Sequence, residues 1–390
     1  MHVITREYSY IDPINWLQDI KDLPGLKVIR LPAGYPSIFF QQKNKYLNFL
    51  IRGYHYLFLI FNRKKIRHDY ASLWIKNLVL FASEYIQKEG IKNLIVSGPP
   101  SSLHLAGALI KSELPWLRLI QDYRDPWTND PVASLKNIKS FESRIAILGD
   151  ESLALSVADH IVVVTKQMKN ELQNIFSIDP EKVNLIPNGY DRDDYRNLGE
   201  LKSRCVQKKI KVAYFGYLGL NESGRLLALN LIGQVLDSMP NGLGDRFEFY
   251  LYSDLPEFYF STSKSSTLRK SVKCLTMLPP NDLMMALMQA DICLSINRQE
   301  DGYAIASKVY DYIGAKKPIL QVAPPGEASS FLSNAGQYVF NYNFEQALHV
   351  LQKVLRDYDS HAGLSIVQKD IYEEYDVENI AIKYANLLVN

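Results

Sequence analysis

Residues 91–123, IKNLIVSGPPSSLHLAGALIKSELPWLRLIQDY, decide the fold class of this chain. The stretch begins with a short apolar run that ends at a glycine. It continues with apolar residues at helical spacing in residues 101–113 and returns to an apolar run in residues 116–123. A strand, a helix and a second strand in about 30 residues are typical of a right-handed βαβ crossover. The stretch therefore predicts a parallel sheet that helices cover on both faces.

Strand and helix patterns continue in two blocks that a polar stretch separates. Residues 142–156 and 166–176 have helical spacing, and HIVVVT is an apolar run between them. The stretch from Asp191 to Lys209 is polar and irregular, and it is the predicted linker. Strand-like runs resume beyond it at residues 210–216, 247–253, 272–278, 290–296 and 318–323.

The two blocks predict an α/β fold with two Rossmann-like, doubly wound domains. We expect these domains at residues 1–192 and 193–373, with a terminal helix in residues 374–390 that packs back onto another element. Two such domains that face each other enclose a cleft lined by the carboxyl ends of both sheets. Binding and catalytic residues are therefore expected in the loops that follow strands.

The composition limits the classes of function. With 390 residues, of which 47% are hydrophobic and 22% are charged, the chain is long enough for two domains with separate cores. The formal net charge of +2 gives no electrostatic reason to expect wholesale nucleic-acid binding. Three scattered cysteines without a CxxC pair argue against a disulfide framework or a structural zinc site. The N-terminus lacks a signal-peptide pattern, so we predict a cytoplasmic location.

Residues 44–68, NKYLNFLIRGYHYLFLIFNRKKIRH, are the most apolar long segment. Arg52 and His55 interrupt it, so it falls short of the roughly 18 to 20 uninterrupted apolar residues that span a bilayer. Its basic end beside aromatic and aliphatic residues is typical of an interfacial helix on an anionic membrane surface. The alternative is an amphipathic helix that is buried against its own domain. Periodicity alone does not separate peripheral membrane contact from this alternative.

The run INRQEDGYAIASKVYDYIGAKKPIL, residues 296–320, predicts an anion site at the start of a helix. Ser307 is placed to cap this helix, whose free backbone N–H groups and positive dipole end suit a diphosphate. Lys308 in the first turn is unfavourable unless an anion is bound there. Asp311 lies one turn further and can accept hydrogen bonds from ribose hydroxyls. The alternative is a surface helix with an ion pair between Lys308 and Asp311.

A glycine-rich loop, FGYLGLNESGR, follows a predicted strand at residues 215–225. Gly216 and Gly219 allow the backbone to approach a phosphate closely, and Arg225 can bind diphosphate oxygens with two N–H groups. The loop does not match GxGxxG, which weakens a dinucleotide interpretation. The alternative is an ordinary turn with a solvated arginine.

The stretch LIQDYRDPWTNDP, residues 119–131, brings charged and aromatic side chains to the end of a strand. Asp122 and Asp125 flank Arg124, so one carboxylate can orient the guanidinium while the other meets an acceptor hydroxyl. Trp127 offers a face for a sugar ring. The alternative is a turn at Asp-Pro with a tryptophan in the core.

A predicted helix in SGPPSSLHL, residues 97–105, follows the first strand of this block. Ser101 and Ser102 are expected to cap it and to lie on the acceptor side. His104 is a candidate acid or base, although a lone histidine on a helix is more often structural.

Together these blocks resemble the GT-B glycosyltransferases, specifically the retaining enzymes of family 4 that occur in bacterial surface-polysaccharide clusters. The ordered set RDPW, IPNGYD and a K-x-x-D-Y helix ending in KKP is more specific than any of its parts. The matching blocks are SGPPSSLHLAGALI, LIQDYRDPW, ADHIVVVTKQMKNEL, VNLIPNGYD, KVAYFGYLG, LMMALMQADICLSI and SKVYDYIGAKKPIL.

The resemblance implies an acceptor-binding N-terminal domain and a C-terminal domain that binds a nucleotide-diphosphate sugar. Asp311 falls where the family commonly has a glutamate that binds the donor ribose. The family's other glutamate falls at Tyr303, and that partner is absent unless Glu300 or Asp301 takes its place. Arg298 is assigned to the donor side and Asn188 in IPNGYD to the acceptor side. The family usually starts earlier, which implies that a first strand is missing here.

The function that follows is that of a hexosyltransferase-type enzyme with a saccharide or lipid-linked saccharide as acceptor. The leaving diphosphate would be stabilised by helix N–H groups, Lys308 and Arg225. As the resemblance implies, the acceptor attacks from the same face and the anomeric configuration is retained. We expect no metal and no other cofactor, because arginine and lysine can neutralise the diphosphate. The alternatives are a GT-B nucleotide-sugar epimerase and a non-catalytic nucleotide-sugar-binding or scaffold protein.

Overall fold

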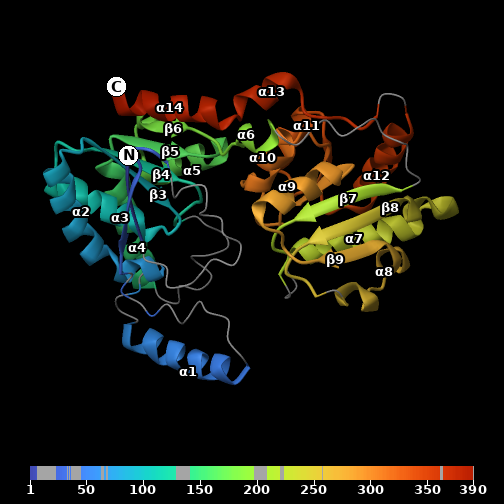
Figure 1. Cartoon of the computed structure of the whole chain (residues 1–390), viewed down its shortest axis with the longest axis horizontal. Helices are drawn as coiled ribbons and strands as arrows, with labels where there is room; N and C mark the ends of the chain where they lie inside the picture. The colour runs from blue at the N-terminus through green and yellow to red at the C-terminus, as the bar shows by residue number, and fades with distance from the viewer. Residues whose placement is uncertain are drawn as a thin grey trace. The chain divides into compact units, whose positions relative to one another are not determined.

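Two compact units make up the chain, Met1–Ile186 with Ala385–Asn390 and Pro187–Tyr384 (Figure 1). The computed structural model describes residues 1–6, 23–32, 34, 36, 45–62, 66, 69–128, 141–196, 209–219, 224–256, 258–360 and 363–389.

The first unit contains a four-stranded parallel sheet in the order β3-β4-β5-β6. Its strands are β3 (Asn93–Gly98), β4 (Arg118–Tyr123), β5 (His160–Val163) and β6 (Val183–Leu185). A separate pair of parallel strands consists of β1 (His2–Arg6) and β2 (Lys27–Leu31). Ser97 lies opposite Asp122, and Gly98 lies opposite Tyr123. This register brings the polar residues at the ends of β3 and β4 to one edge of the sheet.

The helices of the first unit are α1 (Lys45–Asn62), α2 (Ile75–Glu89), α3 (Ser102–Glu113), α4 (Phe141–Ser156) and α5 (Lys166–Phe176). Apolar residues of α2 and α3, such as Leu78, Ile86 and Ile110, pack into one buried cluster. Five of the six residues of β4 are buried, as expected for a strand with helices on both faces. Thr165 caps α5 by accepting a hydrogen bond from the backbone N–H of Met168.

The second unit contains a six-stranded parallel sheet in the order β12-β11-β10-β7-β8-β9. Its strands are β7 (Ile210–Phe215), β8 (Phe247–Tyr252), β9 (Val272–Leu275), β10 (Ile292–Ile296), β11 (Ile319–Val322) and β12 (Tyr338–Phe340). Its α-helices are α6 (Asp193–Arg196), α7 (Gly224–Ser238), α8 (Ser266–Ser271), α9 (Pro280–Gln289), α10 (Ser307–Gly314), α11 (Glu327–Asn334), α12 (Phe344–Asp359) and α13 (Lys369–Glu374), and α14 (Val377–Val389) follows them.

Both faces of this sheet are covered. One buried cluster joins alternate residues of β7, among them Val212 and Tyr214, to α7, α8 and α12. The intervening residues Ala213 and Phe215 belong to a second cluster with α9, α10 and α11. All five residues of β10, the central strand between β11 and β7, are buried. The predicted doubly wound α/β architecture is confirmed in both units.

The elements follow the predicted segments closely, with two differences. The predicted linker from Asp191 to Lys209 includes the short helix α6, and its residues 197–208 lie outside the described residues. Residues 261–266, a serine-rich stretch for which no element is predicted above, contain the end of a 3-10 helix, Tyr259–Thr262, and the first residue of α8. The C-terminal helix packs back as predicted, because the carbonyl of Leu387 accepts a hydrogen bond of 3.4 Å from Arg118.

Helix α1 has one exposed face, while its residues 51, 55, 58, 59 and 62 are half-buried. Leu47, Leu50, Tyr54, Leu57 and Phe61 follow helical spacing and form one exposed face. The basic residues that follow α1 in the sequence, at positions 63–65 and 67, lie outside the described residues. Residue 66 between them is apolar and is described. Among the helices of the described ranges, none has the length and apolar character needed to cross a membrane.

Candidate functional site

The carboxyl ends of β7 and β10 in the second unit lie beside the first turns of α7 and α10. Lys308 in the first turn of α10 reaches back over β7, where its Nζ lies 3.9 Å from the centroid of the Tyr214 ring. Gly216 follows β7 with φ +128°, and a Cβ added there would lie 3.1 Å from the Lys308 Nζ. The positive φ of this residue therefore favours glycine here.

Two cations lie together at this place. Burial, and then the nearby Arg225 guanidinium, lower the pKa of Lys308 to about 7. The Nε of Arg225 is buried and has no hydrogen-bond partner in the described part of the chain. No ion pair to a carboxylate is found for either residue within the described ranges. An anion would supply the missing hydrogen bonds and charge for both side chains.

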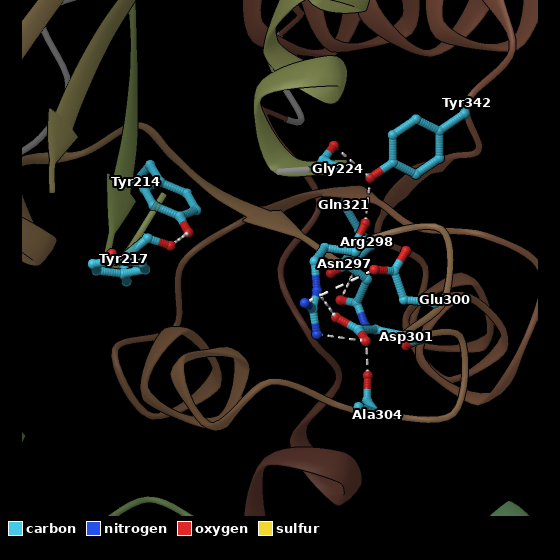
Figure 2. A network of polar contacts seen from close by, with 10 residues as sticks. All are labelled: Tyr214, Tyr217, Gly224, Asn297, Arg298, Glu300, Asp301, Ala304, Gln321 and Tyr342. Atoms are coloured by element: carbon cyan, nitrogen blue, oxygen red, sulfur yellow. Dashed lines mark hydrogen bonds and ion pairs between the residues drawn. The ribbon is translucent and has the colours of Figure 1, made fainter. Parts of the chain in front are cut away.

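The loop between β10 and α10 is fixed by a network around Asn297 (Figure 2). The Asn297 amide donates to the carbonyls of Asp301 at 2.8 Å and Ala304 at 2.6 Å. Its side-chain oxygen accepts from the Gln321 amide at 2.8 Å. The Tyr342 hydroxyl contacts the carbonyls of Asn297 and of Gly224, the first residue of α7. This network joins the start of α7 to the loop that leads into α10.

Arg298, predicted to bind the donor, is held by its neighbour in the structure. Its Nε and Nη2 donate to the two carboxylate oxygens of Asp301 at 2.6 and 3.0 Å, and Glu300 lies 3.8 Å from its Nη1 (Figure 2). Asp301 is buried and already paired, so it is not available in place of the glutamate that the family has at Tyr303. Among the described residues at this edge, Arg225 and Lys308 thus have no carboxylate partner, in contrast to Arg298.

The start of α10 differs from the prediction. Ala306 occupies the N-cap position, and no side chain caps the helix, so the predicted cap by Ser307 is wrong. Ser307 is instead the exposed first helical residue. Because no side chain occupies the cap, the first backbone N–H groups stay available to an anion.

Asp311 forms no ion pair with Lys308 among the described residues, so the predicted alternative of a surface pair is not found. Burial, and then the charge of Asp194, raise the pKa of Asp311 to about 7. The Tyr195 hydroxyl donates to the backbone carbonyl of Asp311 at 3.1 Å. The carboxylate is thus partly buried without a cation among the described residues, and this environment favours hydrogen-bond donors such as hydroxyls.

Hydrogen bonds to an acidic residue that was not predicted, Asp254, fix the glycine-rich loop. Asp254 accepts from the backbone N–H groups of Leu218 at 2.8 Å and Gly219 at 3.2 Å. Gly219 has φ +77°, which favours glycine. The predicted residues 220–223 of this loop lie outside the described residues.

In the first unit, Asp122 orients Arg124 as predicted. The guanidinium donates from Nε to the two carboxylate oxygens at 2.9 and 3.1 Å, and its Nη2 lies 2.7 Å from Oδ1. The Ser97 hydroxyl donates to Asp122 Oδ2 at 2.8 Å. Asp125 is exposed at the surface beside this pair. The arrangement places one fixed cation and one exposed carboxylate after β4.

His104 is buried in the core of the first unit. Its ring stacks on Tyr123 with centroids 4.0 Å apart, and its Nδ1 lies 2.7 Å from the side-chain oxygen of Gln121. Gln121 donates to the carbonyl of His104, so this oxygen accepts the proton of Nδ1. Burial lowers the pKa of His104 to about 4, which keeps the imidazole neutral. This environment supports the structural interpretation and not the predicted acid or base role.

The four predicted acceptor-side residues have mainly structural surroundings. Trp127 is 3% exposed, so its ring is in the core and does not offer a face to a sugar. Ser102 is buried, and its backbone N–H donates to Asp69 at 3.1 Å. Ser101 holds the N-cap position of α3 without a side-chain cap. Asn188 lies in the second unit and is partly buried.

Glu151 and Tyr123 are buried polar residues that the sequence analysis missed. Glu151 in α4 accepts hydrogen bonds from the backbone N–H of Thr128 at 2.9 Å and from its hydroxyl. Burial raises its pKa to about 8. In the sequence, a glutamate among apolar residues at helical spacing was the pattern that could have indicated a buried carboxyl. As for metals, the described ranges contain no cluster of histidine, cysteine and carboxylate ligands.

Comparisons with known proteins agree with this architecture. The model of Glycosyltransferase Family 4 matches residues 128–194, and no curated protein matches the chain. Sucrose-phosphate synthase from Thermosynechococcus elongatus is 15% identical, with 99% of this chain and 88% of that chain covered and a TM-score of 0.62. Anabaena HepE in complex with UDP-glucose is 14% identical, with 100% and 99% covered and a TM-score of 0.58.

A third structure with the same fold has another activity in its name. UDP-GlcNAc 2-epimerase from Neisseria meningitidis bound to UDP-GlcNAc is 14% identical, with 100% of both chains covered and a TM-score of 0.54. At such identities the likeness shows the fold. The predicted GT-B fold is confirmed, and the resemblance to Glycosyltransferase Family 4 is confirmed by the match over residues 128–194.

Proposed function

We propose that this enzyme is a retaining glycosyltransferase that moves a sugar from a nucleotide-diphosphate sugar to a saccharide or lipid-linked saccharide in cell-surface polysaccharide biosynthesis. The observation that carries the proposal is the pairing of Arg225 and Lys308 at the carboxyl edge of the second sheet, where neither cation has a carboxylate partner in the described ranges. Complexes of HepE with UDP-glucose and of the epimerase with UDP-GlcNAc support a uridine-diphosphate sugar as donor.

The diphosphate and the ribose of the donor each meet groups of matching chemistry. The diphosphate accepts hydrogen bonds from Lys308, from Arg225 and from the uncapped N–H groups at the start of α10. Asp311 accepts hydrogen bonds from the ribose hydroxyls, because its carboxylate has no cation beside it in the part of the chain that the structure describes. Gly216 keeps the space above Lys308 open.

The reaction needs no nucleophile from a side chain. The acceptor oxygen forms a bond to the anomeric carbon while the bond from that carbon to the diphosphate breaks. The electron pair of the broken bond stays on the diphosphate, where Lys308 and Arg225 stabilise the charge. The acceptor proton passes to the leaving oxygen on the same face, so the configuration is retained. Arg124, oriented by Asp122, and the exposed Asp125 are the groups in the first unit that we assign to the acceptor hydroxyls.

An epimerase is the second candidate, because the Neisseria meningitidis enzyme shares the fold over the full length of both chains. An epimerase changes the sugar on the nucleotide and needs no acceptor. The two activities therefore differ in whether free nucleoside diphosphate accumulates in proportion to an acceptor.

Proton NMR of the full-length protein with UDP-glucose or UDP-N-acetylglucosamine separates these activities. Methyl β-glucoside and methyl N-acetyl-β-glucosaminide serve as simple acceptors. We expect UDP release that depends on acceptor, together with a new anomeric signal of the same configuration as the donor. A product of opposite configuration would contradict retention, and a C2 epimer that forms without acceptor would favour the second candidate. If neither UDP-glucose nor UDP-N-acetylglucosamine binds, the donor assignment is wrong.

We also propose that α1 holds the enzyme on an anionic membrane surface. Phe49 and Phe61 are 76% and 82% exposed, which is a large cost in water for a helix of a folded unit. The sequence directly after α1 is basic, with Arg63, Lys64 and Lys65. An apolar face next to a basic segment suits a membrane surface that carries acidic lipids.

Flotation with lipid vesicles tests this location. We expect the protein to float with vesicles that contain phosphatidylglycerol and to float weakly with phosphatidylcholine alone. Phe49→Glu and Phe61→Glu together are expected to abolish flotation. Leu80→Glu changes an apolar residue of α2 that is 60% exposed and serves as the matched control. Equal flotation of the two variants would contradict a specific role of α1.

A further inference from the structure

The hydroxyl of Tyr342 joins the two segments that carry the cations of the proposed donor site. Tyr342 lies on the turn between β12 and α12, and its hydroxyl contacts two backbone carbonyls, that of Gly224 at 3.1 Å and that of Asn297 (Figure 2). Gly224 is the first residue of α7 and directly precedes Arg225. Asn297 follows β10 and begins the loop that leads to Lys308 in the first turn of α10. One hydroxyl therefore spans both segments.

The same two segments also touch each other directly. A Cβ added at Gly224 would lie 3.1 Å from the Cβ of Arg298 and 3.3 Å from its Cα, so the lack of a side chain lets α7 begin against this loop. The Arg298 side chain is in turn held by Asp301, with 2.6 Å between Nε and Oδ2. The start of α7 therefore lies against a loop whose own hydrogen bonds fix its shape.

Repulsion between like charges opposes this arrangement. Burial, and then the Arg225 guanidinium, lower the pKa of Lys308 to about 7, so the two cations lie close enough to repel each other. Neither has a carboxylate partner among the described residues that would offset the repulsion. Without an anion, the repulsion favours a larger distance between the first turns of α7 and α10. A hydrogen bond that joins the two segments opposes this separation.

Tyr342 is suited to this role because it stays a neutral donor. Burial, and then the charges of Glu300 and Asp301, raise the pKa of its hydroxyl, so the hydroxyl keeps its proton. The Arg225 guanidinium opposes this rise in pKa, which places it near the hydroxyl as well as near Lys308. The ring of Tyr342 packs against the buried cluster that includes α7 and α12. The core thus holds the ring while the hydroxyl reaches the two carbonyls.

We propose that Tyr342 is a positioning residue for the donor diphosphate, which holds Arg225 and Lys308 at one fixed distance before the nucleotide binds. The inference rests on the proposed function, because these two cations are the proposed diphosphate ligands. A cation pair that is already in place lowers the cost of binding, since like charges do not have to be brought together at that moment. A single phosphate needs only one cation, so the spacing matters for a nucleoside diphosphate and not for a monophosphate.

Calorimetry with the full-length protein tests the inference. Tyr342→Phe removes the hydroxyl and keeps the ring, and the binding of UDP-glucose and of UMP is measured at pH 7 before and after the change. We expect the Kd for UDP-glucose to rise about three- to tenfold, as for the loss of a neutral hydrogen bond. The Kd for UMP should stay nearly unchanged, because UMP does not need both cations.

Tyr338→Phe is the matched control. Tyr338 is a buried residue of β12, and its hydroxyl donates to Asp357 at 2.8 Å and accepts from the backbone N–H of Ser365 at 3.0 Å. This variant also loses a tyrosine hydroxyl with two partners, yet neither partner lies in α7 or in the loop before α10. Thermal unfolding should show a loss of stability in both variants, whereas the affinity for UDP-glucose should fall only in Tyr342→Phe.

Two further measurements separate positioning from a general loss of stability. If Arg225 moves away from Lys308 in Tyr342→Phe, the pKa of Lys308 rises, so the decline of UDP-glucose affinity should shift to higher pH. In a protein that already carries Arg225→Ala, Tyr342→Phe should cause little further loss, because no second cation remains to be held. An unshifted pH profile, or losses that add fully in the double variant, would contradict the positioning role.

The outcomes distinguish this inference from the proposed function. If the unchanged protein binds UDP-glucose and Tyr342→Phe behaves like Tyr338→Phe, the proposed function stands and only the positioning role fails. If the unchanged protein does not bind UDP-glucose, the donor assignment is wrong and the inference fails with it.

Discussion

The ammonium nitrogen of Lys308 lies 3.9 Å from the centroid of the Tyr214 ring. An aromatic face attracts a cation without neutralising it, in contrast to a carboxylate. The Tyr214 hydroxyl donates to the carbonyl of Tyr217 at 3.0 Å, which fixes the ring (Figure 2). The ring therefore positions Lys308, and the charge of the lysine stays available for an anion. Arg298 differs, because Asp301 already balances its charge.

Loss of either cation should weaken diphosphate binding more than monophosphate binding. Arg225→Ala and Lys308→Met each remove a charged donor, which costs about 1.5 to 3 kcal/mol, or roughly 10- to 150-fold in the Kd for UDP. Calorimetry with UDP and UMP measures the difference. Lys270→Met in α8 changes an exposed lysine and should have no effect. An equal loss of affinity for UDP and UMP would contradict the diphosphate assignment.

Donor binding should weaken as the pH rises above 7. Lys308 with a pKa of about 7 carries its charge below this pH and loses it above. The diphosphate of UDP-glucose is fully ionised throughout, so the protein alone sets the change, up to roughly tenfold in Kd per pH unit. Calorimetry from pH 6 to 8 measures it, and Lys308→Met should abolish this decline.

Asp311 titrates in the same range, with a pKa raised to about 7 by burial and Asp194. Asp311→Asn is therefore the control for the pH experiment. The decline above pH 7 should persist in this variant, because Lys308 is intact. If the decline disappears with Asp311→Asn, the carboxylate and not the lysine is responsible.

Glu151→Gln should stabilise the protein at high pH. A buried carboxyl with a pKa of about 8 stabilises the fold fully only below its unfolded value near pH 4.5, and this contribution is lost as the pH rises through 8. The gain from the neutral amide should be near zero at pH 4.5 and about 3 kcal/mol at pH 7. Urea unfolding at pH 5, 7 and 9 measures it. Exposed Glu84 provides the control, and an equal gain for Glu84→Gln would contradict the assignment.

Gly216→Ala should destabilise the second unit and weaken donor binding. At φ +128° an alanine costs about 1 to 3 kcal/mol, and its Cβ would lie 3.1 Å from the Lys308 Nζ. Gly149→Ala in α4 has open space and a helical neighbourhood, so it should stabilise by about 0.5 to 1 kcal/mol. Thermal unfolding and UDP calorimetry compare the two. A Gly216→Ala protein that binds UDP normally would show that the lysine is free to move.

Most of the fold could be predicted because its signals are local. Helix α5 begins and ends where the spacing in residues 166–176 predicts, and Thr165 caps it. The buried strands β4 and β10 follow the apolar runs. The cap of α10 was predicted wrongly, since Ala306 holds the position beside a serine that has the better capping chemistry. Tertiary contacts of the loop around Asn297 decide where that helix begins.

The roles of charged side chains were harder to predict, because a sequence does not show which charges meet. Arg298 and Arg225 look alike in the sequence, yet Asp301 pairs with the first and leaves the second to an anion. His104 looks like a candidate base, and its burial beside Tyr123 makes it a neutral core residue. Glu151 could not be predicted as a perturbed group, because its raised pKa arises from burial and not from its neighbours in the chain.

The sequence by itself determined the alternation of strands and helices, the two sheets and the loops that hold polar residues, because hydrophobic periodicity and turn residues act over a few positions. Only the tertiary structure decided which of those polar residues keep their charge, which are paired and which are buried. Burial and pairing depend on residues brought together from distant parts of the chain, as Lys308 is with Tyr214, Gly216 and Arg225.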